Sequence, residues 1–219
     1  MQRNRLTITL DSELLKGIDG LIDKEELRNR SQTIEHLLKE GIGLHQLKQV
    51  FLFISEDFSQ SHLEAVVKLC SFTEIRQFFV CTPLALQSKV AEITAVINDI
   101  YQAKNLIPSI QAVPFDFGSG GALILQKHLL TTPFFLAWIK EPLPLPQNLI
   151  SPYLFHRRHH PTLTQLLFTS DGATYTSNKL AIAQPELLSS IPAGISQIEE
   201  TVFPELVKDD KVRAYPFAI

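Results

Sequence analysis

The stretch "RLTITLDSELL", residues 5–15, decides the architecture of the amino-terminal part of the chain. Polar and apolar residues alternate over its first six positions, and at Asp11 the pattern becomes acidic and helical. Alternation with a period of two is typical of a strand with one exposed and one buried face. The polar face would carry Arg5, Thr7 and Thr9, and the apolar face Leu6, Ile8 and Leu10. No neighbouring segment offers this strand a partner.

Two helical patterns follow the strand, over residues 11–27 and 27–43. Asp11 and Ser12 provide a cap for the first helix. The second begins with Asn29 and Gln32 at capping-box spacing and ends near Gly41. About forty residues of strand, helix and helix bury too little apolar surface to fold alone. A second copy would supply both the missing strand and the missing cover, so the sequence predicts an obligate homodimer.

This pattern over residues 3–44, with "RSQTI" opening the second helix, resembles the ribbon-helix-helix family of CopG-, Arc- and MetJ-type repressors. The resemblance implies a two-stranded ribbon that enters the major groove of DNA while the second helix contacts a phosphate. It assigns base and backbone contacts to Arg3, Arg5, Thr7, Thr9, Asn29, Arg30 and Ser31.

The charge of this segment departs from that resemblance. Residues 1–44 hold seven basic side chains against eight acidic ones, whereas DNA-binding segments are usually basic. Two interpretations therefore stay open, a DNA operator as partner and a dimerisation module that never touches DNA. If the large domain covered Arg5, Thr7 and Thr9, DNA would be excluded.

Composition describes an ordinary globular chain. Its 219 residues are 45% hydrophobic and 20% charged, and the net charge of −3 argues against a protein that coats nucleic acid or anionic membranes. Cys70 and Cys81 lie in apolar patterns and are interpreted as reduced core residues. No signal peptide is visible, and the longest apolar run, "PFFLAWI", is too short to span a bilayer. We expect a cytoplasmic protein without a membrane partner.

The chain changes character after a short helical bridge, "LHQLKQ". We expect a ribbon-helix-helix module over 1–44, a linker over 45–49 and an α/β domain over 50–219. Apolar runs predict strands at 50–54, 76–80, 109–113 and 134–139, and helices are expected at 60–70, 86–103 and 119–130. Strands that alternate with helices indicate a parallel sheet with helices on both faces and a ligand crevice at the carboxyl ends of the strands.

Residues 50–219 resemble the nucleotidyltransferase fold of sugar-nucleotide pyrophosphorylases. The resemblance rests on "GSGGALILQKHLLTTPFFLAWI", "LISPYLFHRRHHPTLTQLLF" and "SQIEETVFPELVKDDKVRAYPF". It implies a Rossmann-like α/β domain of nucleotidyltransferase type.

The catalytic positions of that family are not retained. "SEDFSQS" follows the first strand where the family has a glycine-rich triphosphate loop, and a segment with a catalytic lysine is missing before His62. Lys140 or Glu141 stands where the family has a metal-binding aspartate, and the chain stops before the second metal position. Nucleotidyl transfer relies on placed metal and cationic groups. We therefore expect a pseudoenzyme with no catalytic residue, metal or cofactor; residual nucleotidyl transfer is the alternative.

A ligand site remains possible in such a domain. Gly118, Ser119, Gly120 and Gly121 lie between a strand and a helix, where glycines let a phosphate or a base approach the backbone. A tight turn explains them equally well. Asp116 could meet a ribose hydroxyl or a guanine edge, or it could cap the helix.

The second group of ligand candidates is cationic. "HRRHHP" ends a helix, so its charges could simply favour the helix dipole, while metal binding by its histidines is disfavoured. Arginine offers planar donors that suit phosphates and guanine edges. Candidates for an anionic ligand are Arg28, Arg30, Arg157 and Arg158.

Three functions follow from these patterns. The first is a dimeric regulator that binds DNA and senses a nucleotide-type ligand. The layout also resembles small cyanobacterial receptors for cyclic di-GMP, which implies a second function: a receptor for a cyclic dinucleotide that acts on a protein partner without DNA. The third is the residual enzyme.

Overall fold

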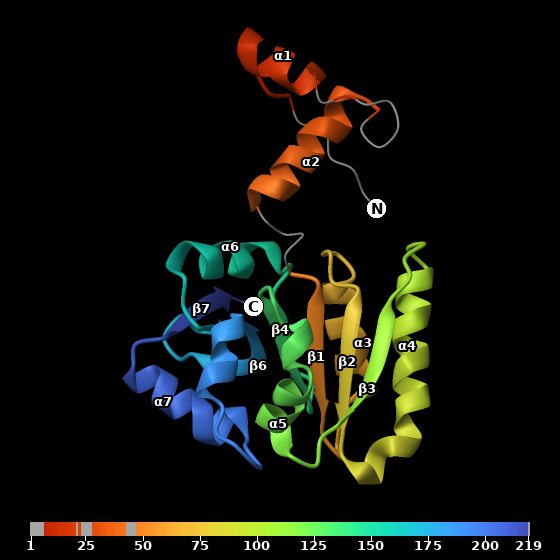
Figure 1. Ribbon diagram of the computed structural model, residues 1–219, viewed down its shortest axis with the longest axis vertical. Coiled ribbons are helices and arrows are strands. Elements are labelled where there is room, and N and C mark those ends of the chain that lie inside the picture. Colours follow the sequence, from red (N-terminus) through yellow and green to blue (C-terminus); the bar gives the residue numbers. More distant parts are fainter. Residues whose placement is uncertain (1–6, 21, 23–27, 43–46, 219) are drawn as a thin grey trace. The chain divides into compact units, whose positions relative to one another are not determined.

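The computed structural model describes residues 7–20, 22, 28–42 and 47–218. The chain divides into two compact units, Met1–Gly43 and Leu44–Ile219, and each is described by itself (Figure 1).

The amino-terminal unit contains α1, Ser12–Gly20, and α2, Arg30–Ile42. The predicted cap of α1 is confirmed, because Oδ1 of Asp11 accepts hydrogen bonds from the backbone N–H groups of Glu13, at 2.9 Å, and Leu14, at 2.8 Å. The capping pattern of α2 is confirmed as well. Asn29 Oδ1 accepts from the Gln32 N–H at 3.1 Å, and Gln32 Oε1 accepts from the Arg28 N–H at 2.9 Å.

Residues 7–10 have no strand structure in the single chain. A strand needs a hydrogen-bonded neighbour, and the predicted neighbour belongs to a second copy, so the ribbon stays a prediction. One local prediction for this unit needs correction. The first helix was predicted to reach residue 27, but α1 ends at Gly20 and Ile22 lies outside any helix. Gly17 and Gly20 weaken its last turns. Residues 21 and 23–27 lie outside the described part.

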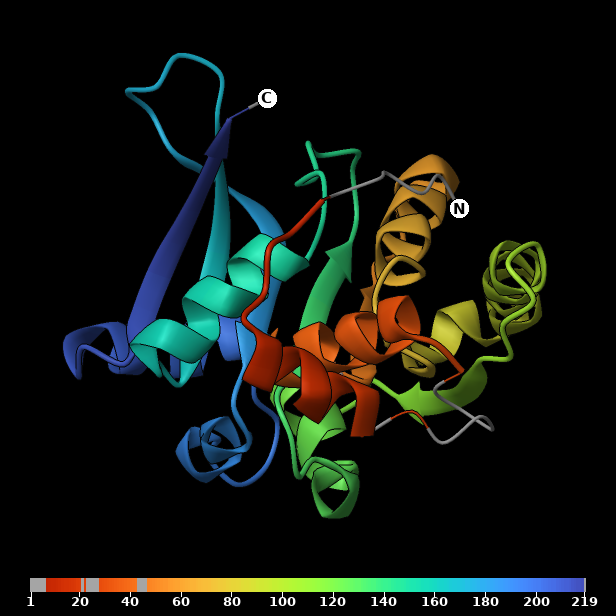
Figure 2. The same ribbon diagram turned by 90° about the horizontal axis from the view of Figure 1, so that it is seen from above.

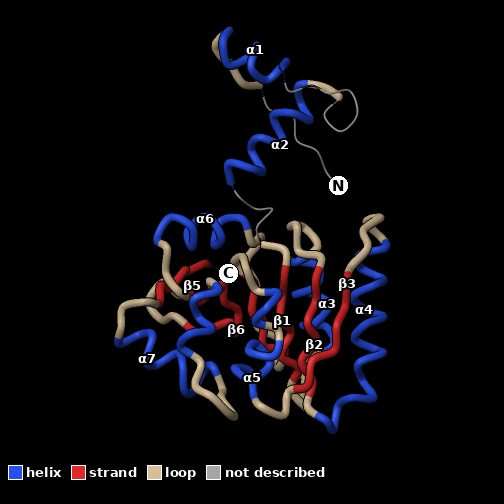
Figure 3. The backbone as a smooth tube through the Cα atoms, in the orientation of Figure 1, coloured by secondary structure: helices blue, strands red, loops and turns tan. Residues whose placement is uncertain are grey.

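The α/β unit is built on one seven-stranded sheet, seen in red in Figure 3, with the order β3-β2-β1-β4-β6-β5-β7. Its strands are β1 Gln49–Ile54, β2 Gln77–Thr82, β3 Ser109–Pro114, β4 Phe134–Ile139, β5 Leu163–Thr169, β6 Thr176–Ala183 and β7 Val212–Ala218.

The parallel pairing expected of the four predicted strands is confirmed, but the sheet as a whole is mixed. Strands β1 to β4 are parallel as predicted, but β6 is antiparallel to both β4 and β5, and β7 is parallel to β5. Among the described strands, β6 therefore runs against all the others. The sequence predicted four of the seven strands of this mixed sheet, and β5, β6 and β7 were not predicted.

Helices cover both faces of the sheet, as expected. Figures 1 and 2 place α3 and α4 on one face and α5 on the other. The predicted helix 86–103 begins as a 3-10 helix, and the predicted helix 119–130 is a shorter helix that also ends in 3-10 form. The remaining helices are α3 Gln60–Cys70, a 3-10 helix Leu84–Lys89, α4 Val90–Gln102, α5 Gly118–Leu125, a 3-10 helix Lys127–Leu129, α6 Ile150–His159, a 3-10 helix Pro185–Ser190, a π-helix Ile198–Val202 and α7 Phe203–Lys208.

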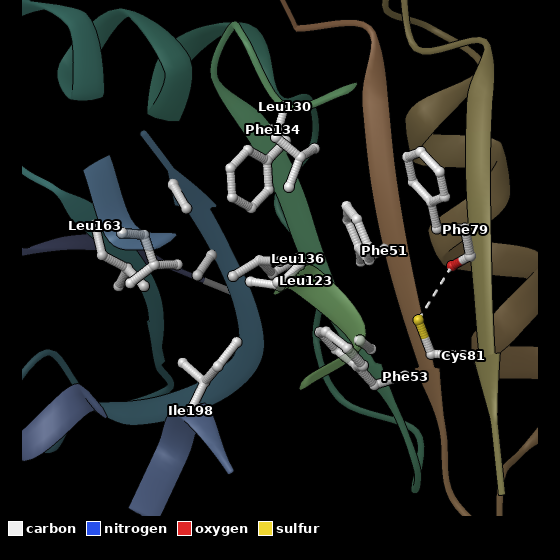
Figure 4. Packing of buried hydrophobic residues seen from close by; sticks show 14 of the residues in the cluster. Phe51, Phe53, Phe79, Cys81, Leu123, Leu130, Phe134, Leu136, Leu163 and Ile198 are labelled. Atoms are coloured by element: carbon white, nitrogen blue, oxygen red, sulfur yellow. Dashed lines mark hydrogen bonds between the residues drawn. The ribbon is translucent and has the colours of Figure 1, made fainter. Parts of the chain in front are cut away.

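The core of this unit follows the period of two along β1. Phe51 and Phe53 point to the face covered by α5, where Phe51 stacks on Phe79 with ring centroids 4.4 Å apart (Figure 4). On the other face Phe78 meets the ring of Tyr101 from α4 at 5.2 Å. Strands buried on both faces lose the polar alternation of surface strands, which is why β1 and β4 were visible as continuous apolar runs.

The linker differs from its prediction, whereas the two cysteines lie where they were expected. The predicted helical bridge is wrong where it is described: Leu47 is buried without helical structure and Gln49 already opens β1. Cys70 and Cys81 are free and buried, as expected, and burial raises the pKa of each thiol far above its usual range. No helix within the described ranges is long and apolar enough to cross a membrane.

Candidate functional site

The start of α2 brings three of the predicted DNA-contacting residues together. Asn29 caps the helix, Arg30 is its first residue and Ser31 is exposed. Arg30 is held by Asp19 of α1 through two hydrogen bonds, from Nε to Oδ1 at 2.5 Å and from Nη2 to Oδ2 at 2.6 Å. The bond to Arg30 lowers the pKa of Asp19, and the same bond raises the pKa of Arg30. Both side chains therefore stay charged at any physiological pH.

The segment before α1 exposes both of its predicted faces in the single chain. Thr7 and Thr9, the polar residues, are exposed, and so is Ile8 on the apolar face, at 47%. Arg3 and Arg5 lie outside the described residues. The apolar stripes of the two helices are also incompletely covered, since Leu14 is 52% exposed, Leu37 39% and Leu38 59%.

The glycine segment at the start of α5 is buried under a later part of its own chain. Gly120 N–H donates to Ser196 O at 2.9 Å, and Ser196 N–H donates to Phe117 O at 3.0 Å. A Cβ on Gly118 would overlap that same Ser196 carbonyl, and one on Gly120 would overlap the Ser196 hydroxyl. The close approach that these glycines permit is therefore to residue 196. Ligand binding by residues 118–121 stays a prediction.

Asp116, the acidic candidate beside this segment, is exposed and does not cap α5. The N-cap position is Phe117, which makes no side-chain capping bond. Of the two roles left open for Asp116, the capping role is thus wrong, because Phe117 occupies the N-cap position.

Ser119 connects α5 to the π-helix. Its hydroxyl accepts from the N–H of Ile198 at 2.8 Å and donates to Oε2 of Glu199 at 2.9 Å. Burial raises the pKa of Glu199, while the Ser119 bond and the charge of Lys179 act in the opposite direction. A π-helix is rare and often occurs at functional positions. Here it places a half-buried carboxyl group beside the sheet.

A cavity of about 460 Å³ lies on the sheet face beside this carboxyl group, between β4, β5, β6 and α7. Lys179 adopts a left-handed conformation there, with φ of 60°. Nε1 of Trp138 is buried and has no hydrogen-bond partner among the described residues. The lining residues are Trp138, Gln165, Ser177, Lys179, Leu180, Ala181, Glu199, Phe203, Pro204 and Val207.

None of the ligand candidates named from the sequence lines this cavity. Ser119 reaches it indirectly, through Glu199. The cavity was not predicted from the sequence, because half of its lining residues come from β5 and β6, which were not predicted. One signal was available, namely the acidic "SQIEE" segment, which the resemblance had already singled out.

The loops after β1 and β4 close on each other. Ser59 N–H donates to Lys140 O at 2.7 Å, Lys140 Nζ lies 3.9 Å from a carboxylate oxygen of Asp57, and Leu143 N–H reaches Nδ1 of His62 at 3.4 Å. Burial lowers the pKa of His62. The ends of these two parallel strands are therefore bridged by protein groups.

The cationic cluster at the end of α6 separates into buried and exposed members. His156 is buried with Nδ1 2.8 Å from the Thr164 hydroxyl, and burial lowers its pKa to about 4. His159 packs on Phe155, His160 ends the helix with φ of 47°, and Arg158 is exposed. Arg157 is half-buried and has an interaction partner. In the described part of the chain, no three His, Cys, Asp or Glu side chains gather as metal ligands.

Comparison with known proteins adds a family for one unit. Residues 4–44 match the family described as ribbon-helix-helix protein, copG family. No curated protein matches the chain. The match covers α1, α2 and the segment with Thr7 and Thr9, which is the part that the sequence pattern had assigned to the same family. The amino-terminal part of this chain, residues 4–44, is a ribbon-helix-helix domain of the copG family.

Proposed function

We propose that this protein is a dimeric, DNA-binding transcription regulator. The observation that carries the proposal is the exposure of Ile8, Leu14, Leu37 and Leu38 within a ribbon-helix-helix domain. Exposing four large apolar side chains to water on so small a unit is unfavourable for a monomer and is typical of an interaction surface. A second copy would pair its strand with residues 5–10 and cover these side chains, which leaves Thr7 and Thr9 on the outer face of the ribbon.

The outer face of that ribbon reads base edges in this proposal, and the start of α2 holds the DNA backbone. Threonine suits the first role because its hydroxyl bonds base edges and its methyl group contacts thymine. Asn29 and Ser31 stand at a helix amino terminus, where backbone N–H groups and the helix dipole favour a phosphate. The segment is slightly acidic overall, so affinity depends on these few local contacts.

Selection of duplexes from a random library with the full-length protein tests this function. We expect enrichment of one sequence, arranged as an inverted repeat because the ribbon has twofold symmetry. Thr9→Asp should abolish enrichment, since it places a charge against the DNA, while Thr131→Asp on the exposed surface of the α/β unit should not. Failure of the wild type to enrich any sequence would contradict the function and favour a receptor that acts through a protein partner.

For the α/β unit we infer a sensory role without catalysis. The contacts between the loops after β1 and β4 support the absence of nucleotidyl transfer. Asp57 and Ser59 contact Lys140 in the loops where the pyrophosphorylases that this domain resembles would bind a triphosphate and its metal. A cavity of about 460 Å³ is within the usual size of small-ligand sites. Its aromatic wall and its amide, hydroxyl and charged groups suit the base and sugar of a nucleotide or cyclic dinucleotide.

The fluorescence of Trp138 tests the sensory role, because it is the one tryptophan in the sequence and it lines the cavity. A panel of nucleotides and cyclic dinucleotides should contain one that changes this fluorescence and stabilises the protein by about 2.7 kcal/mol at a hundred times its Kd. Lys179→Asn, which tolerates the left-handed backbone, should weaken it. Pyrophosphorylase assays should give background only. A panel without any response would contradict ligand sensing.

A further inference from the structure

The pair formed by Asp19 and Arg30 joins the last turn of α1 to the first residue of α2. Its geometry is bidentate, with two parallel hydrogen bonds of 2.5 and 2.6 Å between the carboxylate and one side of the guanidinium group. Both side chains are well exposed, 39% for Asp19 and 54% for Arg30. An exposed ion pair adds little to stability. The main effect of this ion pair is therefore to fix the position of the Arg30 side chain.

The bonds to Asp19 use the Nε–Nη2 side of the guanidinium group. A guanidinium has five N–H donors in one plane, and two of them are taken here. The other three are the two hydrogens of Nη1 and the second hydrogen of Nη2. One hydrogen from each of these two nitrogens forms the end-on edge of the fork. No described residue accepts a hydrogen bond from that edge. Arg30 is therefore fixed by its Nε–Nη2 edge, while the adjacent end-on edge can bind two acceptors in the same plane.

We propose that Asp19 is a positioning residue that presents the end-on edge of Arg30 to DNA. This inference rests on the proposed DNA-binding function and adds a residue that does not itself contact DNA. Two coplanar acceptors are offered by phosphate oxygens and by O6 and N7 of guanine. A fixed fork loses less conformational freedom on binding than a free arginine, so Asp19 strengthens the contact that requires this geometry.

The same carboxylate also repels DNA. Its negative charge lowers the affinity for every duplex, because non-specific binding follows the number of neutralised phosphates. Asp19 thus has opposite effects on two measurable quantities: it raises affinity for the cognate sequence through Arg30 and lowers affinity for random sequence through its charge. A carboxylate that only masked Arg30 would lower both affinities alike.

The test measures binding of the full-length protein to two probes, the duplex that the wild type enriches and a random duplex of equal length. Asp19→Asn should bind the enriched duplex about tenfold more weakly and the random duplex more tightly, and Asp19→Glu should restore most of the discrimination. Glu13→Gln, which removes an exposed carboxylate from the same helix, should raise both affinities and leave their ratio unchanged.

Arg30→Lys provides the independent arm of the experiment. It keeps the charge but removes the planar fork, so the ratio should fall as in Asp19→Asn, and the double variant should fall no further. A loss confined to the enriched duplex assigns the contact to a base edge, and an equal loss for both probes would contradict the proposal. Equal gains for both probes in Asp19→Asn would overturn the proposal. If the wild type enriches no duplex, the DNA-binding function fails first.

Discussion

Gly118 lies where the backbone of α5 comes closest to another part of the chain. Its φ of 73° is unfavourable for any residue with a Cβ, and that Cβ would overlap the carbonyl group of Ser196. Gly172 has nearly the same φ, 71°, but open space around it. The two glycines therefore separate the cost of the backbone conformation from the cost of the contact.

We expect Gly118→Ala to lower the free energy of unfolding of the α/β unit by about 3 kcal/mol or more and Gly172→Ala by about 1 kcal/mol. Urea unfolding followed by the fluorescence of Trp138 reports this unit alone, since the sequence has one tryptophan. Equal losses in the two variants would show that the segment around Ser196 moves freely away from α5.

His156 gives the α/β unit a dependence on pH. Burial lowers its pKa from 6.5 to about 4, so between these pH values the unfolded chain binds a proton at His156 that the folded protein does not bind. The stabilisation is complete above pH 6.5 and is lost as the pH falls toward 4, by about 3 kcal/mol in total. His156→Gln should reduce this loss in urea unfolding at a series of pH values. Glu199, whose raised pKa acts in the opposite direction, is the same in both proteins, so the difference isolates His156.

At the scale of single residues, the amino-terminal caps of α1 and α2 were the features that the sequence predicted best. Asp11, Asn29 and Gln32 act through neighbours within four positions, and such local bonds depend little on the rest of the fold. Ser119 and Glu199 are 80 positions apart. Their contact depends on how α5 and the π-helix pack, which no local pattern reveals.

Among the elements, α1 depends on its cap more than a longer helix would, because it has only nine residues, including Gly17 and Gly20. Asp11→Ala removes the acceptor of two backbone N–H groups. It should destabilise the amino-terminal unit by about 1 kcal/mol, visible as a lower melting temperature of its helical circular dichroism. Glu13→Ala, in the same turn and exposed, is the matched control, and an equal effect of both variants would contradict the capping role.

The predicted strands were those that read as short apolar runs between helical patterns, including β3, which is mostly exposed. β1 and β4 are nearly continuous apolar runs, whereas the apolar run of β5 is interrupted by Thr164 and Gln165. β7 alternates half-buried with exposed positions, and β6 opens with Thr176, Ser177 and Asn178. The turn at Asp171, which accepts bonds from Ala173 and Thr174, links β5 and β6 as a hairpin. Apolar run length alone could not show it.

For the whole molecule, the ribbon connects folding of the amino-terminal unit to association. Ile8→Asp would place a charge among apolar side chains that a second chain has to cover, and we expect it to prevent dimer formation. Thr9→Asp, one position further on the opposite face of the strand, should leave the dimer intact and remove DNA binding. Sedimentation of both variants distinguishes the two faces, and two dimeric variants would contradict the assigned register.

Light scattering at micromolar concentration gives the mass of the wild-type protein in solution and so shows whether two copies associate. A single chain is 24.7 kDa, so we expect a dimer of about twice that mass. The measurement needs no operator and no ligand. It depends only on whether a second copy covers Ile8, Leu14, Leu37 and Leu38. A particle of 24.7 kDa would contradict the account, because without a partner chain the ribbon that reads DNA does not form.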